Sequence, residues 1–322
     1  MPSTKPALSQ LHGVLVLDKP KGPTSARCIG AIKRLGQKKI GHAGTLDPMA
    51  TGVLVVLLGE ATKIAGHVMD GEKTYLGTLR LGQTTDTYDA EGTVTAEAPW
   101  EHLTPEAVRE AITAWREETR QEVPPYSAAK HQGRPLYALA RKGLDAPVKE
   151  KDITIFDAQV VSLDLPSATF RVRVSTGTYI RSLVHSLGKR LGCGAVLTAL
   201  TREASSPFRL EGAHGLDTVL AAPETLPERI IPLAAALPDW PVVTLDAAAA
   251  VLVGQGVRLP VTDPQPAGTR VLLADATGRP LALAQATDTD DGPRWAILRG
   301  LIGDPQPARR GGPEASPRGE TL

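Results

Sequence analysis

The sequence predicts an α+β protein of two domains, and three observations support this prediction. The length of 322 residues exceeds what one hydrophobic core usually organises. Strand and helix patterns are mixed without a regular strand-helix-strand period, which disfavours a doubly wound sheet. After the Ala- and Pro-rich stretch 221–240, short Val and Leu runs separated by Pro, Gly and Asp replace the earlier pattern. We therefore expect a large domain at 11–238 and a small β-barrel-like domain at 239–302, with disordered tails at 1–10 and 303–322.

The first hundred residues contain three strand patterns and one helix pattern. Residues 13–18 form a β-rich apolar run that ends in the tight-loop sequence Lys-Pro-Lys-Gly-Pro. A helix capped at 24–25 follows, with apolar residues at helical spacing, basic residues on the opposite face, and Gly36 as its stop. The all-apolar run 53–58 and the run 75–81 are predicted strands.

The second half of the large domain contains two predicted helices and two predicted strands. Thr104 and Pro105 open an amphipathic helix. Strands are expected at 153–165 and 168–175. The clearest helix covers 178–192, where apolar residues recur at i, i+3, i+4, i+7 and i+11 before a terminal glycine. In the small domain, the strand candidates are 242–245, 256–259, 270–274 and 280–284.

Composition excludes several classes of protein. Cys28 and Cys193 are the only cysteines, which excludes a disulfide framework or a zinc ribbon and fits a reducing cytoplasm. The seven histidines show no metal-ligand spacing, and no apolar run is long enough to span a bilayer. Walker A, dinucleotide-binding, serine-hydrolase and zincin motifs are absent from the sequence. We expect a cytoplasmic protein with no metal, no cofactor and no membrane contact.

Charge is unevenly distributed along the chain, although the formal net charge is only +1. Segment 18–42 has seven basic residues and one acid, and segment 171–202 has six basic residues and no acid. Segment 84–122 has ten acids and three basic residues. The two basic segments could bind a polyanion. The alternative is that each is an ordinary solvated surface.

The strongest chemical signal is the loop Gly41–Gly52, between the basic helix and the buried strand. Its three glycines allow the backbone to approach a ligand closely, and Asp47 before Pro48 is held out of the helical region. An isolated Asp-Pro pair is most often a simple turn, so the surrounding sequence must decide between the two interpretations.

The surrounding sequence resembles the TruB family of tRNA pseudouridine synthases over about residues 11–205. The loop itself reads Gly-His-Ala-Gly-Thr-Leu-Asp-Pro-Met-Ala-Thr-Gly-Val-Leu. The other matching motifs, in the same order as in the family, are GVLVLDKP at 13–20, GEATK at 59–63, RLGQTTDT at 80–87, PPYSAAK at 124–130, GTYIR at 177–181 and LGCGA at 191–195.

This resemblance implies an α+β, pseudouridine-synthase-like fold: a mixed, largely antiparallel sheet with flanking helices, followed by a small PUA-like β domain. The implied reaction is isomerisation of uridine 55 in the tRNA T-loop to pseudouridine, without cofactor or metal. Asp47 is the implied catalytic aspartate, which can attack or deprotonate the sugar or add to the base. Arg181, in the first turn of the 178–192 helix, is its implied counter-charge. Tyr75 is the implied active-site tyrosine that stacks on the base.

Further substrate contacts follow from the same resemblance. Tyr179 and Leu200 match positions that line the uracil pocket, and His42 matches a histidine that contacts displaced nucleotides. The target base must be flipped out of a folded loop, so phosphate and stacking contacts have to offset that cost. Lys19 in the first basic segment and Lys130 are expected to bind RNA. Lys130 lies in residues 124–151, which resemble the family's RNA-gripping insertion.

Two alternatives to this function differ in their partners. A guide-dependent rRNA pseudouridine synthase of the dyskerin group is expected to carry a stronger PUA domain and lysine-rich tails, which this chain lacks. A non-catalytic RNA chaperone would use the same basic groove to open and refold tRNA. Because tRNA folds its own recognition element, we expect a monomer that needs no obligatory protein partner.

Overall fold

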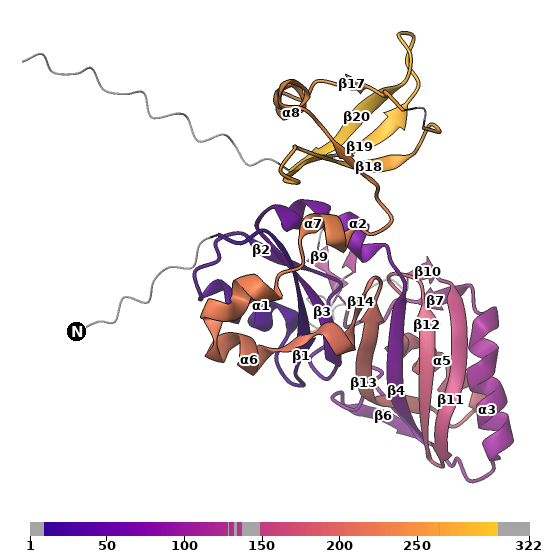
Figure 1. Cartoon of the computed structure of the whole chain (residues 1–322). Helices are drawn as coiled ribbons and strands as arrows, with labels where there is room; N and C mark the ends of the chain where they lie inside the picture. Colours follow the sequence, from indigo (N-terminus) through magenta and orange to yellow (C-terminus); the bar gives the residue numbers. More distant parts are fainter. Residues whose placement is uncertain (1–9, 128, 132–133, 137–148, 264, 302–322) are drawn as a thin grey trace, which may run out of the picture. The chain divides into compact units, whose positions relative to one another are not determined.

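The computed structural model describes residues 10–127, 129–131, 134–136, 149–263 and 265–301. The chain forms two compact units, residues 1–238 and 239–322 (Figure 1). Residues 1–9 of the expected N-terminal tail, the whole expected C-terminal tail, and residues 128, 132–133 and 137–148 of the expected insertion lie outside the described residues. No helix in the described part is long and apolar enough to cross a membrane.

The first unit is built on a nine-stranded sheet with the order β11-β12-β4-β13-β3-β1-β15, to which β2 and β14 add by pairing with β3 and β13. β1 pairs with β15 and β13 pairs with β3 in parallel, whereas the other pairs in this sheet are antiparallel. The strands are β1 (Gly13–Lys19), β2 (Ile40–Ala43), β3 (Thr51–Leu58), β4 (Lys73–Leu81), β11 (Ile155–Asp164), β12 (Ser167–Val174), β13 (Ala195–Ser205), β14 (Phe208–Arg209) and β15 (His214–Gly215). The expected mixed, largely antiparallel sheet is confirmed.

Helices and short hairpins connect these strands. The α-helices are α1 (Ser25–Lys33), α2 (Ala65–Met69), α3 (Pro105–Thr113), α5 (Ile180–Leu191), α6 (Leu216–Ala221) and α7 (Leu233–Ala236). The 3₁₀ turns are η1 (Gly59–Ile64), η2 (Ala114–Glu117), η3 (Leu210–Gly212) and η4 (Pro223–Arg229). The two-stranded pairs are β5 (Gln83–Thr85) with β6 (Val94–Glu97), β7 (Arg120–Glu122) with β10 (Glu150–Asp152), and β8 (Lys130–His131) with β9 (Arg134–Pro135).

One hydrophobic cluster joins the helices to one face of the sheet. Apolar residues of α1, α3, α5 and α6 pack with alternate residues of β1, β3, β4, β12 and β13. The loop between β2 and β3 contributes Leu46, Met49 and Ala50 to this cluster, and the sheet contributes Tyr75 and Leu200. The loop of Asp47 is therefore fixed on the helix-covered face, where burial of apolar surface holds it in place.

The predicted caps of α1 and α3 are confirmed, whereas α5 begins at Ile180, two residues after the predicted start at 178. Thr24 caps α1 by accepting from the Arg27 amide, and Thr104 caps α3 by accepting from the Ala107 amide. Gly192 ends α5 in the left-handed conformation with φ 77°. The α1 helix stops at Lys33, before the predicted glycine.

The second unit is a five-stranded sheet with the order β16-β18-β19-β20-β17 and one helix. Its elements are β16 (Val242–Thr244), α8 (Ala247–Gly254), β17 (Leu259–Pro260), β18 (Arg270–Ala274), β19 (Pro280–Thr287) and β20 (Arg294–Gly300). The sequence did not predict α8, although Asp246 caps it by accepting from the Ala249 amide before a run of alanines. The expected strand at 256–259 is reduced to Leu259 and its neighbour, because Gly256 turns the chain with φ 81°.

Candidate active site

Asp47 lies in the loop that connects β2 to β3. Gly44 adopts φ 77°, a conformation that favours glycine, and turns the chain away from β2. The Asp47 carbonyl then accepts from the Ala50 amide at 3.1 Å, which closes a tight turn around Pro48. This turn holds the Asp47 side chain at the protein surface, where its exposed fraction is 38%.

Lys19, at the end of β1, anchors one side of this loop. Its ammonium donates to the carbonyls of Ala50 at 2.7 Å, Pro20 at 2.9 Å and Pro48 at 3.2 Å. The residue is completely buried, and this burial lowers the pKa of the Lys19 amine. The expectation that Lys19 binds RNA is therefore corrected: its three donors are used by backbone carbonyls that would otherwise be unpartnered.

Arg202 of β13 and Ser25 of α1 anchor the rest of the loop. Arg202 is 1% exposed, and its guanidinium donates to the carbonyls of Val53 at 2.7 Å and Gly44 at 2.8 Å. The Ser25 hydroxyl donates to the Leu46 carbonyl and accepts from the Leu46 amide. The backbone on both sides of Asp47 is thus fixed before any substrate binds, which is the preorganisation that catalysis requires.

Arg181, in the first turn of α5, orients the Asp47 carboxylate. Its Nε donates to Oδ2 at 2.9 Å and its Nη2 donates to Oδ1 at 3.1 Å, a two-pronged contact that sets the plane of the carboxylate. The Arg181 side chain is only 5% exposed, whereas that of Asp47 is 38% exposed. One side of the Asp47 carboxylate is therefore held by protein and the other side is open to a ligand.

Arg181 is itself held by three further groups. Its Nη1 donates to the Thr87 carbonyl at 2.8 Å, its Nη2 donates to the Tyr126 carbonyl at 2.9 Å, and its Nε lies 3.6 Å from Oδ2 of Asp89. Four of the five guanidinium N–H groups therefore have partners, so the side chain has one preferred orientation. Asp89 is buried and accepts from the Thr87 hydroxyl at 2.6 Å, which fixes it beside Arg181.

The sequence matches known proteins along most of its length. Residues 33–180 match the family described as TruB family pseudouridylate synthase (N terminal domain). A protein described as tRNA pseudouridine synthase B from Nitratidesulfovibrio vulgaris (strain DSM 19637 / Miyazaki F) is 60% identical over 300 residues, covering 91% of this chain and 97% of that protein. The chain belongs to the TruB family. A tRNA pseudouridine synthase B from Syntrophotalea carbinolica is 43% identical over 86% of this chain and 92% of that protein.

Solved structures show the same fold. A Cbf5-Nop10-Gar1 complex contains a chain with a TM-score of 0.67 and 25% identity, covering 90% of this chain and 85% of that chain. An H/ACA ribonucleoprotein bound to a substrate RNA contains one with a TM-score of 0.66 and 24% identity, covering 91% and 86%. The expected fold class, a pseudouridine-synthase sheet with a small PUA-like β domain, is confirmed.

Tyr75 and Leu200, two residues implied by the TruB resemblance, lie on the sheet face that carries the Asp47 loop. Tyr75 of β4 is directly opposite Arg202 of β13 in the antiparallel register, and Leu200 is opposite Gly77. Directly opposed residues point to the same face, so both side chains flank the arginine that holds the loop. Gly77 has no side chain, and the Phe170 ring packs against its backbone. A Cβ atom at position 77 would lie 2.5 Å from that ring.

Tyr179 and His42 each lie near charged groups of the site, Tyr179 near Arg181 and Asp47, and His42 near Arg202. Tyr179 precedes α5; its main-chain N–H donates to Oε1 of Gln121, and its main-chain carbonyl accepts from Nε2 of the same side chain. Burial raises the pKa of the Tyr179 phenol, and the charges of Arg181 and Asp47 both act on it. The Nε2 atom of His42 lies 3.2 Å from the Thr45 hydroxyl, and burial, assisted by the charge of Arg202, lowers the pKa of His42.

Lys130 remains a prediction. Its backbone belongs to the short strand β8, and its side chain lies outside what the structure describes. Among the described residues, no group of three or more His, Cys, Asp or Glu side chains is placed to hold a metal ion.

Segment 171–202 is not a surface of unpaired cations, although its composition alone suggests one. All six basic side chains of this segment have partners. A count of charges within residues 171–202 could not include these partners, because they come from other segments. These are Glu203 for Arg171, Glu72 for Arg173, Asp47 and Asp89 for Arg181, Glu122 for Lys189, Glu118 for Arg190, and two backbone carbonyls for Arg202.

Segment 18–42 differs from segment 171–202. Lys39 forms an ion pair with Glu60 at 3.1 Å, and Lys19 is buried. The other basic side chains are exposed on and around α1 and form no ion pair with the described residues; they are Lys21, Arg27, Lys33, Arg34 and Lys38. We call these five residues the α1 basic surface.

Sequence reasoning missed three residues that hold the site in this TruB protein: Asp89, Arg202 and Gln121. Asp89 follows the motif at 80–87 by two positions, and Arg202 follows Leu200 by two positions, so both were close to recognised signals. Gln121 had no signal, because its role depends on a contact with Tyr179, 58 residues away.

Proposed function

We propose that this protein isomerises uridine 55 in the T-loop of tRNA to pseudouridine, with Asp47 as the catalytic carboxylate. The support is twofold: the named relatives are tRNA pseudouridine synthases at up to 60% identity over most of both chains, and Asp47 has the geometry that the reaction needs. The observation that carries the proposal is the half-exposed Asp47 carboxylate, held on both oxygens by a buried arginine.

The reaction breaks the bond between C1′ of the ribose and N1 of the uracil, and forms a bond between C1′ and C5. The C5 proton is lost and a proton is gained at N1, so atoms balance and no electrons are transferred. An aspartate can attack C1′, deprotonate the sugar or add to the base, and each route places the carboxylate against the nucleotide. Arg181 fixes that carboxylate, and Tyr75, Leu200 and Tyr179 would surround the detached base.

RNA binding has to offset the cost of flipping the base, roughly a few kcal/mol. We assign the phosphate contacts to the α1 basic surface, because its cations are exposed and free of ion pairs with described residues, and to the insertion that contains Lys130. Segment 171–202 is left out of this assignment, since its cations are already paired. We expect the protein to act in the cytoplasm as a monomer, with no guide RNA and no obligatory protein partner.

The test is incubation of the purified protein with an unmodified tRNA transcript, with no cofactor, guide RNA or second protein, followed by site-resolved mapping of pseudouridine. We expect conversion confined to the T-loop uridine. Asp47→Asn keeps the shape of the side chain and removes its charge, so conversion should be lost while tRNA binding remains.

Two outcomes would contradict the proposal. A wild-type protein that binds the transcript and converts no uridine would favour the chaperone or guide-dependent alternatives. An Asp47→Asn protein that retains full activity would remove Asp47 from the chemistry. A melting curve of the variant distinguishes loss of chemistry from loss of folding.

A further inference from the structure

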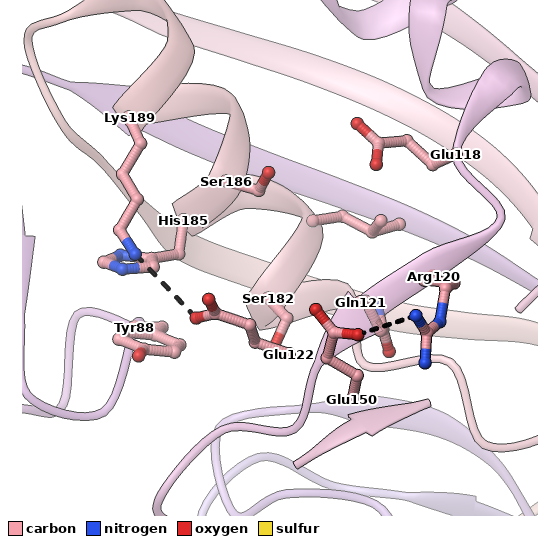
Figure 2. Close-up of a pocket in the computed structure, with 11 residues that line it drawn as sticks. Tyr88, Glu118, Arg120, Gln121, Glu122, Glu150, Ser182, His185, Ser186 and Lys189 are labelled. Carbon is pink, nitrogen blue, oxygen red and sulfur yellow. Dashed lines mark ion pairs between the residues drawn. The ribbon is translucent and has the colours of Figure 1, made fainter. Parts of the chain in front are cut away.

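A strained turn and a stacked ring pair lie behind Arg181, in a part of the molecule to which the reaction assigns no role. A pocket of about 170 Å³ is lined by one side of α5, by β7 and β10, and by Tyr88; its lining residues are drawn in Figure 2. Tyr88 and His185 face each other at one end of it, with ring centres 3.7 Å apart and planes inclined by 9°. His185 lies one turn after Arg181 on the same helix.

Tyr88 has an unusual backbone conformation. Its φ is 66°, and among the described residues it is the only non-glycine residue with a positive φ. A bulky side chain is disfavoured in this left-handed region, and such strain persists only where surrounding structure enforces it. Contacts around Tyr88 therefore have to keep this turn in place; backbone hydrogen bonds supply some of them, and the stacked His185 ring supplies a side-chain contact.

The turn at Tyr88 presents two of the groups that hold Arg181. The residue before it, Thr87, supplies the carbonyl that accepts from Nη1 at 2.8 Å, and the residue after it, Asp89, supplies the carboxylate 3.6 Å from Nε. The Tyr88 carbonyl accepts from the Leu197 amide of β13 at 3.2 Å, which ties the turn to the sheet. A different φ at Tyr88 would move both Arg181 partners.

His185 is suited to stacking rather than to ion pairing. Burial and the nearby Lys189 lower its pKa to about 4, against the opposing influence of Glu122, so the ring is neutral at physiological pH. Its Nδ1 atom is buried without a hydrogen-bond partner in the described structure. Lys189 and Glu122 are 3.8 Å apart in an ion pair beside the ring (Figure 2), which leaves the flat face of the imidazole as its main contact.

We propose that His185 is a positioning residue for the reaction: by stacking on Tyr88 it holds the strained turn whose Thr87 and Asp89 groups orient Arg181, and through Arg181 it orients the Asp47 carboxylate. This inference rests on the proposed function. It assigns His185 no contact with substrate, and it predicts an effect on the chemical step and none on tRNA affinity.

The test is a double-mutant cycle between His185→Ala and Tyr88→Gly, read as the single-turnover rate of pseudouridine formation with saturating enzyme. A stacked aromatic pair is worth about 0.5–1.5 kcal/mol, so His185→Ala should lower the rate about 2.3- to 13-fold. Glycine adopts φ 66° without strain, so in the Tyr88→Gly background His185→Ala should change the rate less than about twofold. His185→Phe preserves the stack and should react like the wild type.

Affinity and stability measurements separate this role from a general contribution to folding. The dissociation constant for tRNA should stay within about twofold of wild type in all variants. Ser186→Ala, which alters the same pocket without touching the stack, is the matched control and should leave the rate unchanged. Rates are measured well below the lowest melting temperature of the set.

Three results would overturn the inference: a His185→Ala protein that reacts like the wild type, a loss that is equally large in the Tyr88→Gly background, or a loss that appears in tRNA affinity. A wild-type protein that forms no pseudouridine is a separate outcome, which would refute the proposed function itself.

Discussion

Replacement of Arg181 by lysine is the substitution that tests the site geometry most directly. Arg181→Lys keeps the positive charge between Asp47 and Asp89 and removes the planar arrangement of donors. The guanidinium makes two hydrogen bonds to Asp47 and two to backbone carbonyls. One ammonium at the end of a shorter, narrower side chain cannot donate to both carboxylate oxygens and to both carbonyls at once.

The expected loss follows from these contacts. A hydrogen bond to a charged group contributes about 1.5–3 kcal/mol, and a buried carbonyl left without a donor costs about 1–3 kcal/mol. Loss of one bond to Asp47 and partial loss at the carbonyls therefore costs about 2–4 kcal/mol. If the orientation of Asp47 is needed in the transition state, the single-turnover rate should fall about 30- to 1,000-fold, since each 1.36 kcal/mol is a factor of ten.

The assay is the single-turnover rate of pseudouridine formation, measured beside the dissociation constant for tRNA. Arg181 is buried, so tRNA affinity should change less than about threefold. Arg190→Lys is the matched control on the same helix, because its exposed ion pair with Glu118 contributes little. A rate within about threefold of wild type would show that the two-pronged contact is not required. Loss of affinity with an unchanged rate would show that Arg181 contacts RNA.

Three further predictions concern stability, RNA binding and pH. Lys19→Met leaves the carbonyl partners of Lys19 without donors. The free energy of unfolding, measured in urea, should therefore fall by about 2–4 kcal/mol. An unchanged free energy would exclude the anchoring role of Lys19. Replacing Lys33 and Arg34 by glutamine should make the plot of log affinity for tRNA against log salt concentration less steep, by about 1–2 in the magnitude of its slope. Arg171→Gln removes a cation that is already paired, so it should leave this slope unchanged. The folded-state pKa of His185 is about 4 and the unfolded value about 6.5, so only the unfolded chain binds this proton between those values. Stability should therefore fall by about 1 kcal/mol per pH unit on acidification from about 6.5 to 4; His185→Phe should lack this component, and identical pH profiles of the two proteins would contradict it.

The fold could be predicted from the sequence where local signals decide the structure. Thr24 and Thr104 cap their helices as their sequences suggest, and Gly192 ends α5. Propensity, capping and apolar spacing act over a few residues, so they can be read without tertiary information. The helix α8 was missed because its Asp246 cap is followed by alanines, which carry no amphipathic pattern.

The pairing of Asp47 with Arg181 could be predicted only through the family resemblance. The two residues are 134 positions apart, and composition gives no sign that they meet. The surroundings of the pair were not predicted for the same reason. Asp89 and Tyr88 lie in a segment that reads as an ordinary turn, and Tyr88 gains its partner only when α5 packs beside it.

These ion pairs could not be predicted from the sequence, for one physical reason. A segment's charge count assumes that basic side chains face solvent, yet the sheet register places Glu203 beside Arg171, from 32 residues away, and the fold places Glu72 beside Arg173, from 101 residues away. These four side chains largely neutralise one another at the surface. The basic residues of α1 have no such neighbours among the described residues, because α1 lies outside the sheet and its outer face meets no strand.

Lys19 and Arg202 show how a cation can serve the active site without meeting the substrate. The loop around Asp47 leaves strand pairing, so its carbonyls need donors, and its own side chains are too short or too apolar to supply them. The donors come instead from the ends of β1 and β13, where Lys19 reaches Pro48 and Ala50 and Arg202 reaches Gly44. A neutral donor would satisfy fewer carbonyls, whereas a buried cation holds several at once through stronger hydrogen bonds. The two buried cations beside the loop, Lys19 and Arg202, therefore fix it, and in our proposal RNA contact falls to cations that the fold exposes.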